Sequence, residues 1–351
     1  MAFTAVDKGE TYFNTVLYTG NDTARSITTG LVSTDFIWNK RRDSTGNHLL
    51  YDRNRGINID LNTDSQEADE TQVGTVTAFG TNTFSLGTHG GTNANGETKV
   101  NWCWAAGGAA SSNGNGTITS NVSVNTTSGF SIVTYTGNGT TNATIGHGLS
   151  GTPAWILLKN RDDSENWWNY HVGLSDPSTK AILMNSTNGE FTPGTSAWYP
   201  TNFSSSVFSV LTDNASNSSG DDYVAYCWKE VKGFSKFGSF TGNGDSDGPF
   251  VYCGFKPAWV LTKKVSEDSG EWHIYDNKRV TLNPNNNVLS PNANYADSIN
   301  ANVNTDFLSN GFKIRNDNDN RNDDGETHMF CAFAEHPFVS STGTPVTAKL
   351  T

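Results

Sequence analysis

Cysteine is the residue whose spacing in this sequence most invites a chemical role. Three of the four cysteines lie in aromatic-rich segments: NWCWAA (101–106), AYCWKE (225–230) and MFCAFAE (329–335). The chain has no Cys-x-x-Cys spacing of the kind that zinc sites use. A cysteine inside an alternating aromatic strand is typical of a small buried hydrophobic residue. We therefore expect reduced, buried thiols at Cys103, Cys227, Cys253 and Cys331, with no disulfide and no metal.

The acidic run NDNDNRNDDGE (316–326) resembles the loop of an EF-hand calcium site. Such a loop needs oxygen ligands at positions 1, 3 and 5, glycine at position 6 and glutamate at position 12. Starting the pattern at Asn320 places Cys331 at position 12, and starting it at Asp317 places Arg321 at position 5. We therefore predict a solvated hairpin here and no metal-binding residue.

Signatures of catalysis and cofactor binding are missing from the sequence. It contains no His-Glu-x-x-His. The glycines of YTGNG (135–139) could suggest a phosphate loop, but no helical pattern follows, and related segments recur at Tyr18 and Phe240. Paired carboxylates of a glycoside hydrolase stay open, because they can meet only in space. We predict no catalytic residue, no cofactor and no enzymatic activity.

Three tryptophans are the candidates for stacking on a sugar ring. Trp167, Trp168 and Trp198 belong to the second of three similar units, whereas Trp155 and Trp259 recur at one equivalent point. Recurring aromatic residues are typical of a core. If the protein binds a glycan, we expect Trp167, Trp168 and Trp198 to make the contact.

The recurring residues indicate three copies of one unit. Pairs of phenylalanines five residues apart precede the cysteine strands, and the second phenylalanine lies 19 residues before the cysteine each time. The segments FIWNK (36–40), WILLK (155–159) and WVLTK (259–263) keep the same order. We therefore predict equivalent core positions in the three units: Phe84, Cys103, Phe208, Cys227, Phe312 and Cys331.

The repeats divide the chain into six segments. We predict an N-terminal arm at 1–15, repeats at 16–106, 131–232 and 236–338, a Gly/Ser/Asn/Thr linker at 107–130, and a C-terminal arm at 339–351. Because the linker and arms are too polar to form a core, we expect them to lie across neighbouring units or chains, some pairing with exposed strand edges. In the isolated protein we expect them to be loose.

Alternating patterns of four to seven residues, with turn residues every eight to twelve, indicate the fold of each repeat. Examples are FSVLT and YVAYCW. This spacing predicts an all-β chain of three tandem homologous antiparallel β-sandwich units of the jelly-roll type.

Charge and hydropathy exclude several classes of protein. The net charge of −12 without a basic stripe argues against nucleic-acid binding. No run of 18 apolar residues exists, so we expect no membrane insertion. The first residues, MAFTAVDKGETYFNT, contain no apolar segment of a secretory signal.

The chain resembles a family of virion proteins from tailed bacteriophages, especially those of marine bacteria such as cyanobacteria. The resemblance rests on YTGNG (135–139) with IGHGL (145–149), on WILLKNRD (155–162), DDYVAYCWKEVKGFSKFGSFTGNG (221–244), DGPFVYCGFKPAWVLTK (247–263) and DFLSNGFKIR (306–315). It covers nearly the whole chain, and the first unit is the most divergent.

The resemblance implies a non-enzymatic structural or adhesive protein on the particle surface, assembled in the host cytoplasm. We expect a tail- or fibre-associated protein whose partners are other virion proteins and copies of itself. A capsid decoration protein is the alternative, and a receptor-binding module that contacts a host surface glycan is the second alternative.

Overall fold

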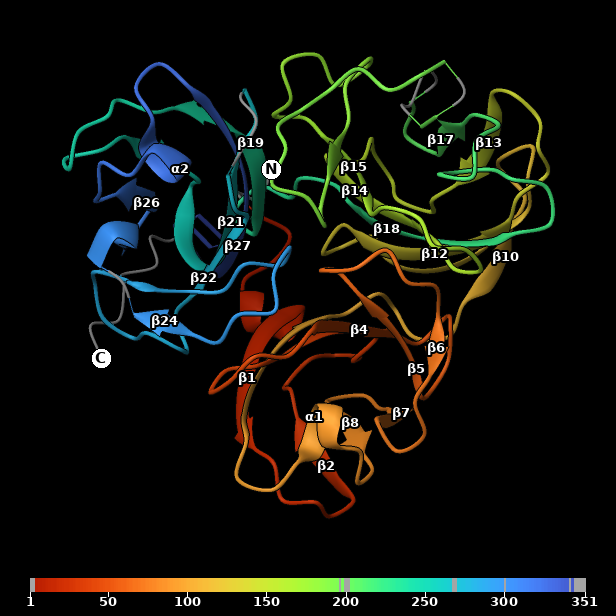
Figure 1. Ribbon diagram of the computed structural model, residues 1–351, viewed down its shortest axis with the longest axis horizontal. Helices are drawn as coiled ribbons and strands as arrows, with labels where there is room; N and C mark the ends of the chain where they lie inside the picture. The colour runs from red at the N-terminus through yellow and green to blue at the C-terminus, as the bar shows by residue number, and fades with distance from the viewer. Residues whose placement is uncertain are drawn as a thin grey trace.

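The structure is a computed structural model that describes residues 4–195, 197–198, 203–266, 270–299, 301–340 and 342–343. The protein is all-β, with 43% strand and 4% helix. Its strands form three groups arranged around a common centre (Figure 1). Among the described residues, no helix is long and apolar enough to cross a membrane.

The first group contains a six-stranded and a three-stranded sheet. The larger sheet has the order β1 (Phe13–Thr19), β9 (Thr98–Trp104), β3 (Phe36–Arg41), β4 (His48–Asp52), β5 (Ile59–Asn62) and β6 (Glu70–Thr71). The smaller sheet has the order β2 (Arg25–Thr28), β8 (Thr83–Leu86) and β7 (Val76–Phe79). The 3-10 helix η1 (Gly9–Thr11) precedes β1, and α1 (Gly90–Asn93) precedes β9.

The second group contains a seven-stranded and a two-stranded sheet. The larger sheet has the order β10 (Ser111–Asn113), β11 (Ser120–Asn125), β12 (Phe130–Thr136), β18 (Asp222–Trp228), β14 (Trp155–Asn160), β15 (Trp168–His171) and β16 (Ile182–Leu183). The smaller sheet pairs β13 (Ala143–Gly146) with β17 (Val207–Val210).

The third group contains a four-stranded and a three-stranded sheet and one short hairpin. The larger sheet has the order β19 (Ser235–Thr241), β27 (Thr327–Pro337), β21 (Phe255–Lys264) and β22 (His273–Asp276). The smaller sheet has the order β20 (Phe250–Tyr252), β26 (Gly311–Ile314) and β25 (Thr305–Leu308), and β23 (Asn287–Val288) pairs with β24 (Ser298–Ile299). The helices are η2 (Ala301–Val303) and α2 (Asp319–Asn322).

The same pairing register recurs in the three groups. In the larger sheets Phe36 pairs with Trp104, Trp155 with Trp228, and Trp259 with Phe333. In the smaller sheets Ile27 pairs with Phe84, Ile145 with Phe208, and Val251 with Phe312.

Each larger sheet is buried on both faces. One face packs on the smaller sheet of its own group, as Phe84 and Cys103 do in the first group and Phe208 and Cys227 in the second. The other face joins a cluster that contains residues of all three groups, among them Trp104. Burial on both faces explains why the central strands are nearly continuous hydrophobic runs rather than strict alternations.

Cys331 does not occupy the position of Cys103 and Cys227. Cys103 pairs with Ile37 and Cys227 with Ile156, but the residue at that place in the third group is Ala332, which pairs with Val260. The cysteine strand of the third group, β27, begins one residue further from Phe312 than β9 begins from Phe84 and β18 from Phe208. Because successive residues of a strand point to opposite faces, Cys331 lies on the other side of its sheet. All four thiols are free and buried.

The segment predicted as a linker belongs to the second group. β11 pairs with β12 over five residues, and β10 pairs with β11. The segment therefore covers the edge of a sheet within its own chain, which confirms the expected pairing with a strand edge, whereas the prediction of a linker between units is wrong for these strands. Covering an edge removes a row of unpaired backbone groups.

The segment before β1 is also packed. Val6 is 1% exposed in the cluster shared by the three groups. The ring of Tyr12 contacts the ring of Phe234 at 6.2 Å, and η1 lies against β27. The segment thus links the first group to the third and closes the ring of three. Most of the predicted C-terminal arm lies outside the described residues.

Truncating Phe84, Phe208 or Phe312 to alanine will lower the free energy of unfolding by about 3–5 kcal/mol each, because each ring is at most 1% exposed between two sheets. Urea unfolding followed by tryptophan fluorescence measures the loss. Phe338 is 40% exposed, and its alanine variant is the control, with an expected change within about 0.5 kcal/mol. Losses at the three core positions no larger than at Phe338 would contradict this account.

Candidate functional site

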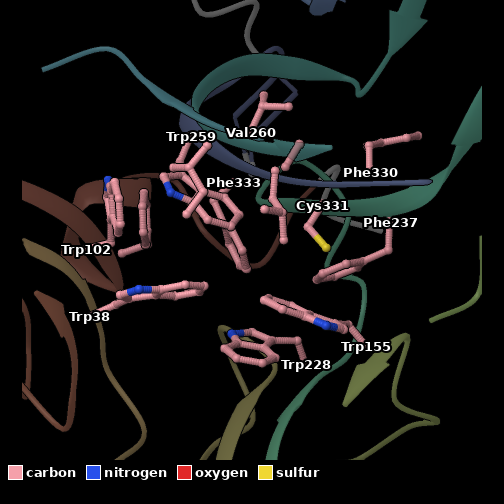
Figure 2. Packing of buried hydrophobic residues seen from close by; sticks show 14 of the residues in the cluster. Trp38, Trp102, Trp155, Trp228, Phe237, Trp259, Val260, Phe330, Cys331 and Phe333 are labelled. Carbon is pink, nitrogen blue, oxygen red and sulfur yellow. The ribbon is translucent and has the colours of Figure 1, made fainter. Parts of the chain in front are cut away.

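The three groups meet in an aromatic centre. The ring of Trp104 lies within 4.7–6.4 Å, between centroids, of six other rings. These rings are Phe13 and Phe36 of the first group, Phe130 and Trp228 of the second, and Trp259 and Phe333 of the third. Figure 2 shows how Trp228, Trp259 and Phe333 face this centre from their own sheets.

Around the centre, one type of contact recurs at each interface between groups. It joins the last residue of β4, β15 or β22 to a residue of the next group. The Tyr226 hydroxyl donates to Asp52 Oδ2 at 2.7 Å, and the Trp102 indole nitrogen donates to Asp276 Oδ2 at 3.1 Å.

At the interface between the second and third groups, the same place holds a histidine and a thiol. His171 Nε2 lies 3.5 Å from Cys331 Sγ. The one-residue shift of Cys331 thus gives it the position of Tyr226 and Trp102, and a contact at the interface.

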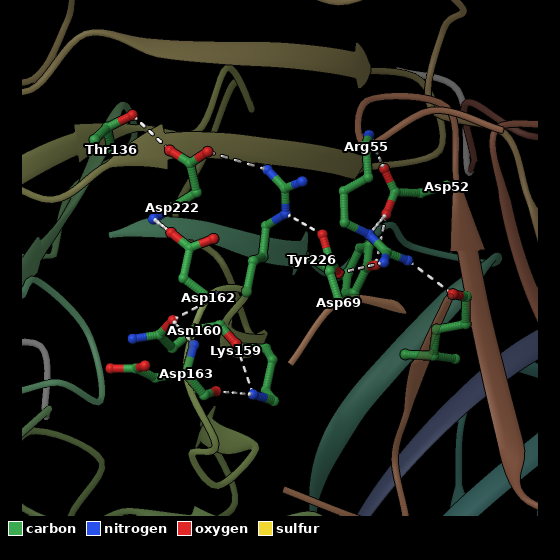
Figure 3. Close-up of polar contacts among 12 residues, drawn as sticks. Asp52, Arg55, Asp69, Thr136, Lys159, Asn160, Asp162, Asp163, Asp222 and Tyr226 are labelled. Carbon is green, nitrogen blue, oxygen red and sulfur yellow. Dashed lines mark hydrogen bonds and ion pairs between the residues drawn. The ribbon is translucent and has the colours of Figure 1, made fainter. Parts of the chain in front are cut away.

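An arginine holds the carboxylate at the interface between the first and second groups. Arg55 is buried and binds Asp52, the Leu50 carbonyl oxygen at 2.7 Å and Asp69 at 2.8 Å. Asp69 also receives Arg161 of the second group at 2.6 Å. Figure 3 shows this chain of ion pairs running from Asp52 through Asp69 to the second group.

The interface between the third and first groups has the same construction. Arg279 is buried and binds Asp276, the Ile274 carbonyl oxygen at 2.8 Å and Asp297 at 3.0 Å. Asp297 receives Arg42 of the first group at 2.6 Å.

The interface between the second and third groups replaces these charges. Leu174 follows His171 by three residues, as Arg55 follows Asp52, and it is 5% exposed. His171 Nδ1 accepts the Gly173 backbone N–H at 2.9 Å, and burial lowers the pKa of His171 to about 3. This recurring contact is therefore neutral, whereas the equivalent contacts at the other two interfaces are charged.

A buried lysine is the penultimate residue of β3, β14 and β21. Lys40, Lys159 and Lys263 each donate to the carbonyl oxygen of the following residue, at 2.7, 2.6 and 2.8 Å. Burial lowers the pKa of Lys40 and of Lys159 to about 8. Charge-assisted bonds to carbonyl oxygens give these lysines a structural role.

The three tryptophans expected to contact a glycan are buried. Trp167 and Trp198 are 0% exposed and Trp168 is 7% exposed. The Trp167 indole nitrogen donates to the Asn62 carbonyl oxygen of the first group at 2.7 Å, and that of Trp198 donates to the Ser209 carbonyl oxygen at 3.0 Å. A sugar needs an open ring face to stack on, so the prediction of a stacking platform at these residues is wrong.

The acidic run 316–326 contains the short helix α2 rather than only a hairpin. The buried Asn322 side chain donates to the carbonyl oxygens of Asn316 and Asp245, and Asn318 caps the helix. In the part of the chain that the structure describes, no group of three or more His, Cys, Asp or Glu could hold a metal ion.

A polar pocket on the first group was not predicted from the sequence. We call it the Asp60 pocket: it has a volume of about 460 Å³ and its lining includes Arg41, Leu49, Asp60, Glu70, His89 and Lys99. Asp60 is 6% exposed, and burial raises its pKa to about 6. The sequence signal was the alternation of Asp60 and Asn62 in IDLN, where the equivalent strand of the second group has Ile182 and Leu183.

Replacing Asp52 by alanine will lower the free energy of unfolding by about 3–5 kcal/mol, because it leaves the buried Arg55 and the Tyr226 hydroxyl without this acceptor. Urea unfolding measures the loss. The exposed Lys236–Glu230 pair offers the control, and Glu230→Ala will cost about 0–1 kcal/mol. Equal losses for the two variants would show that the buried network does not hold the groups together.

His171 will make the protein less stable in acid. Its pKa is about 3 when folded and near 6.5 when unfolded, so below pH 6.5 only the unfolded chain takes up this proton. The free energy of unfolding should fall by about 2–3 kcal/mol between pH 6.5 and 4.5 on account of this residue. His171→Asn will remove that part of the slope while keeping an acceptor for Gly173. Parallel pH profiles for the two proteins would contradict the assignment.

Comparison with known proteins gives one match. No curated protein and no solved structure is similar to the chain. A family model described as "Domain of unknown function (DUF7483)" matches residues 8–337. The match spans all three groups of sheets, from η1 to the end of β27. The chain therefore belongs to the DUF7483 family.

Proposed function

We propose that this chain is a non-enzymatic structural protein exposed on a bacteriophage particle, associated with the tail or a fibre. In this proposal the three groups of sheets are homologous β-sandwich units that form a trimer-like ring within one chain. The recurring contact between groups carries the proposal: Asp52 with Tyr226, Asp276 with Trp102, and His171 with Cys331.

The homology of the units is supported by position rather than by residue type. The three larger sheets share one order of core strands, and their central pairs are in register. The contacts between groups also use equivalent backbone atoms. The N–H groups of Asp69, Glu190 and Asp297 donate to the carbonyl oxygens of Arg161, Val265 and Arg42, at 2.8, 2.8 and 2.7 Å. Three unrelated domains would not be expected to meet through the same atoms.

A structural role accounts for the charged groups that could otherwise act in catalysis. Asp52 with Arg55 and Asp276 with Arg279 form fully buried ion pairs within their own groups, and each aspartate accepts a hydrogen bond from the next group. His171 is buried and neutral. These groups hold the ring closed. Placement on a phage particle is supported by the sequence resemblance, and three equivalent sides suit a site of three-fold symmetry.

Counting and locating the protein in purified phage particles tests the proposal. We expect tens of copies or fewer per particle by gel densitometry against the major capsid protein, and immunogold label on the tail or fibres in electron micrographs. Hundreds of copies with label over the head would favour capsid decoration instead. Absence of the protein from particles of a phage that encodes it would overturn the proposal.

A further inference from the structure

We propose that the Asp60 pocket binds a small organic cation that carries a protonated primary amine. The pocket lies on the face of the first group's larger sheet that is turned towards α1, between β3, β4, β5 and β9. All its lining residues belong to the first group and none of them forms the recurring contact between groups, so this inference goes beyond the structural role.

The floor of the pocket carries a carboxylate that forms no ion pair among the described residues, and the cation that acts on it, Arg55, is bound to Asp52 and Asp69. Asp60 is 94% buried, its Oδ1 has no hydrogen-bond partner, and it forms no ion pair among the described residues. Glu70 is its direct neighbour in the β5–β6 pairing, so two acidic side chains share this end of the pocket. A buried charge is unfavourable unless it is paired, which makes the site receptive to a cation.

The two basic residues of the pocket are already neutralised. Arg41 binds Glu97 at 2.5 Å, and Lys99 binds Glu97 at 2.8 Å and the Gly91 carbonyl oxygen at 2.8 Å. Neither forms an ion pair with Asp60 in the part of the chain that the structure describes. The acidic end therefore remains available to a cation from outside.

The acceptors select an ammonium over a sugar. Asn62, two residues from Asp60 on the same face of β5, also has an Oδ1 without a partner among the described residues. An ammonium has three donors and a positive charge, which suits Asp60, Asn62 and Glu70 together. The lining contains no phenylalanine, tyrosine or tryptophan ring on which a sugar could stack. The described residues also provide no cluster for a metal ion.

The second group shows how the same place looks when it is filled. Trp168 and Leu183 of the second group take the places of Leu49 and Asn62, because each pair lies opposite one another at the same point of its sheet. In the same way, Ala181 and Phe191 take the places of Asp60 and Glu70.

The rings of Trp168 and Phe191 pack at 5.6 Å, in a cluster with Ala181 and Leu183. In the third group Val288 replaces Asp60, and the buried Arg321 reaches across to the Tyr275 hydroxyl. The first group thus has an open polar pocket where its siblings have packed side chains.

Calorimetric titration of the whole protein at pH 7 tests the proposal with a matched pair of probes. 1,5-Diaminopentane carries two ammonium groups, and 1,5-pentanediol has the same length without charge. We expect one diamine to bind per chain, at least tenfold more tightly than the diol. Equal binding of the diol would overturn the assignment of an amine and favour a polyol.

Variants locate the site. Asp60→Asn keeps the shape and removes the charge, so we expect at least a tenfold loss of diamine affinity. Asp176→Asn, at a carboxylate on an exposed turn, is the matched control and should bind as the wild type does. The triple change Asp60→Ala, Asn62→Leu, Glu70→Phe introduces the residues of the second group and should abolish binding while thermal unfolding stays cooperative. Unchanged affinity in Asp60→Asn or in a folded triple variant would overturn the proposal.

Discussion

Every large sheet of this protein has two apolar faces but only one small sheet of its own to cover them. The uncovered face carries rings such as Phe36, Trp155 and Trp259, and these would be exposed if a group stood alone. The three groups cover one another's faces around Trp104, and the closed ring follows from this requirement. Burial of large aromatic surfaces is the dominant favourable term, and it has no direction of its own. The polar contacts at the rim of the centre determine which groups are neighbours and how they are oriented.

Those polar contacts differ in chemistry although they agree in position. Two interfaces use a carboxylate held by a buried arginine, and the third uses His171 and Leu174. A buried ion pair adds little net stability compared with apolar packing, but it penalises a wrong partner strongly. A group that met the wrong neighbour would leave Asp69 without Arg161, or Asp297 without Arg42. The charged interfaces therefore select which group lies next to which, while the aromatic centre supplies most of the adhesion.

The sequence allowed the all-β class and the burial of Phe84, Phe208 and Phe312 to be predicted, because turn residues and alternation act locally. The equal spacing from the second phenylalanine to the cysteine gave a wrong prediction at Cys331. A single extra residue reverses the face on which a strand's side chains lie, and the count alone does not show where that residue is inserted. Trp167 could not be assigned from the sequence, because its partner lies in another group. The Asp60 pocket escaped prediction for a related reason: it depends on side chains that the first group lacks and its siblings have.

The segment that contains Val6 and η1 packs against β27, at the opposite end of the described chain. The ribosome synthesises this segment before all three groups, and β27 only after the other strands of the three groups have been made. Until then the aromatic face of the first group has no complete cover, and nascent chains on one messenger could pair with each other instead of closing on themselves. Rapid closure after release from the ribosome, or protection by a chaperone during synthesis, is the biosynthetic requirement that this ring imposes.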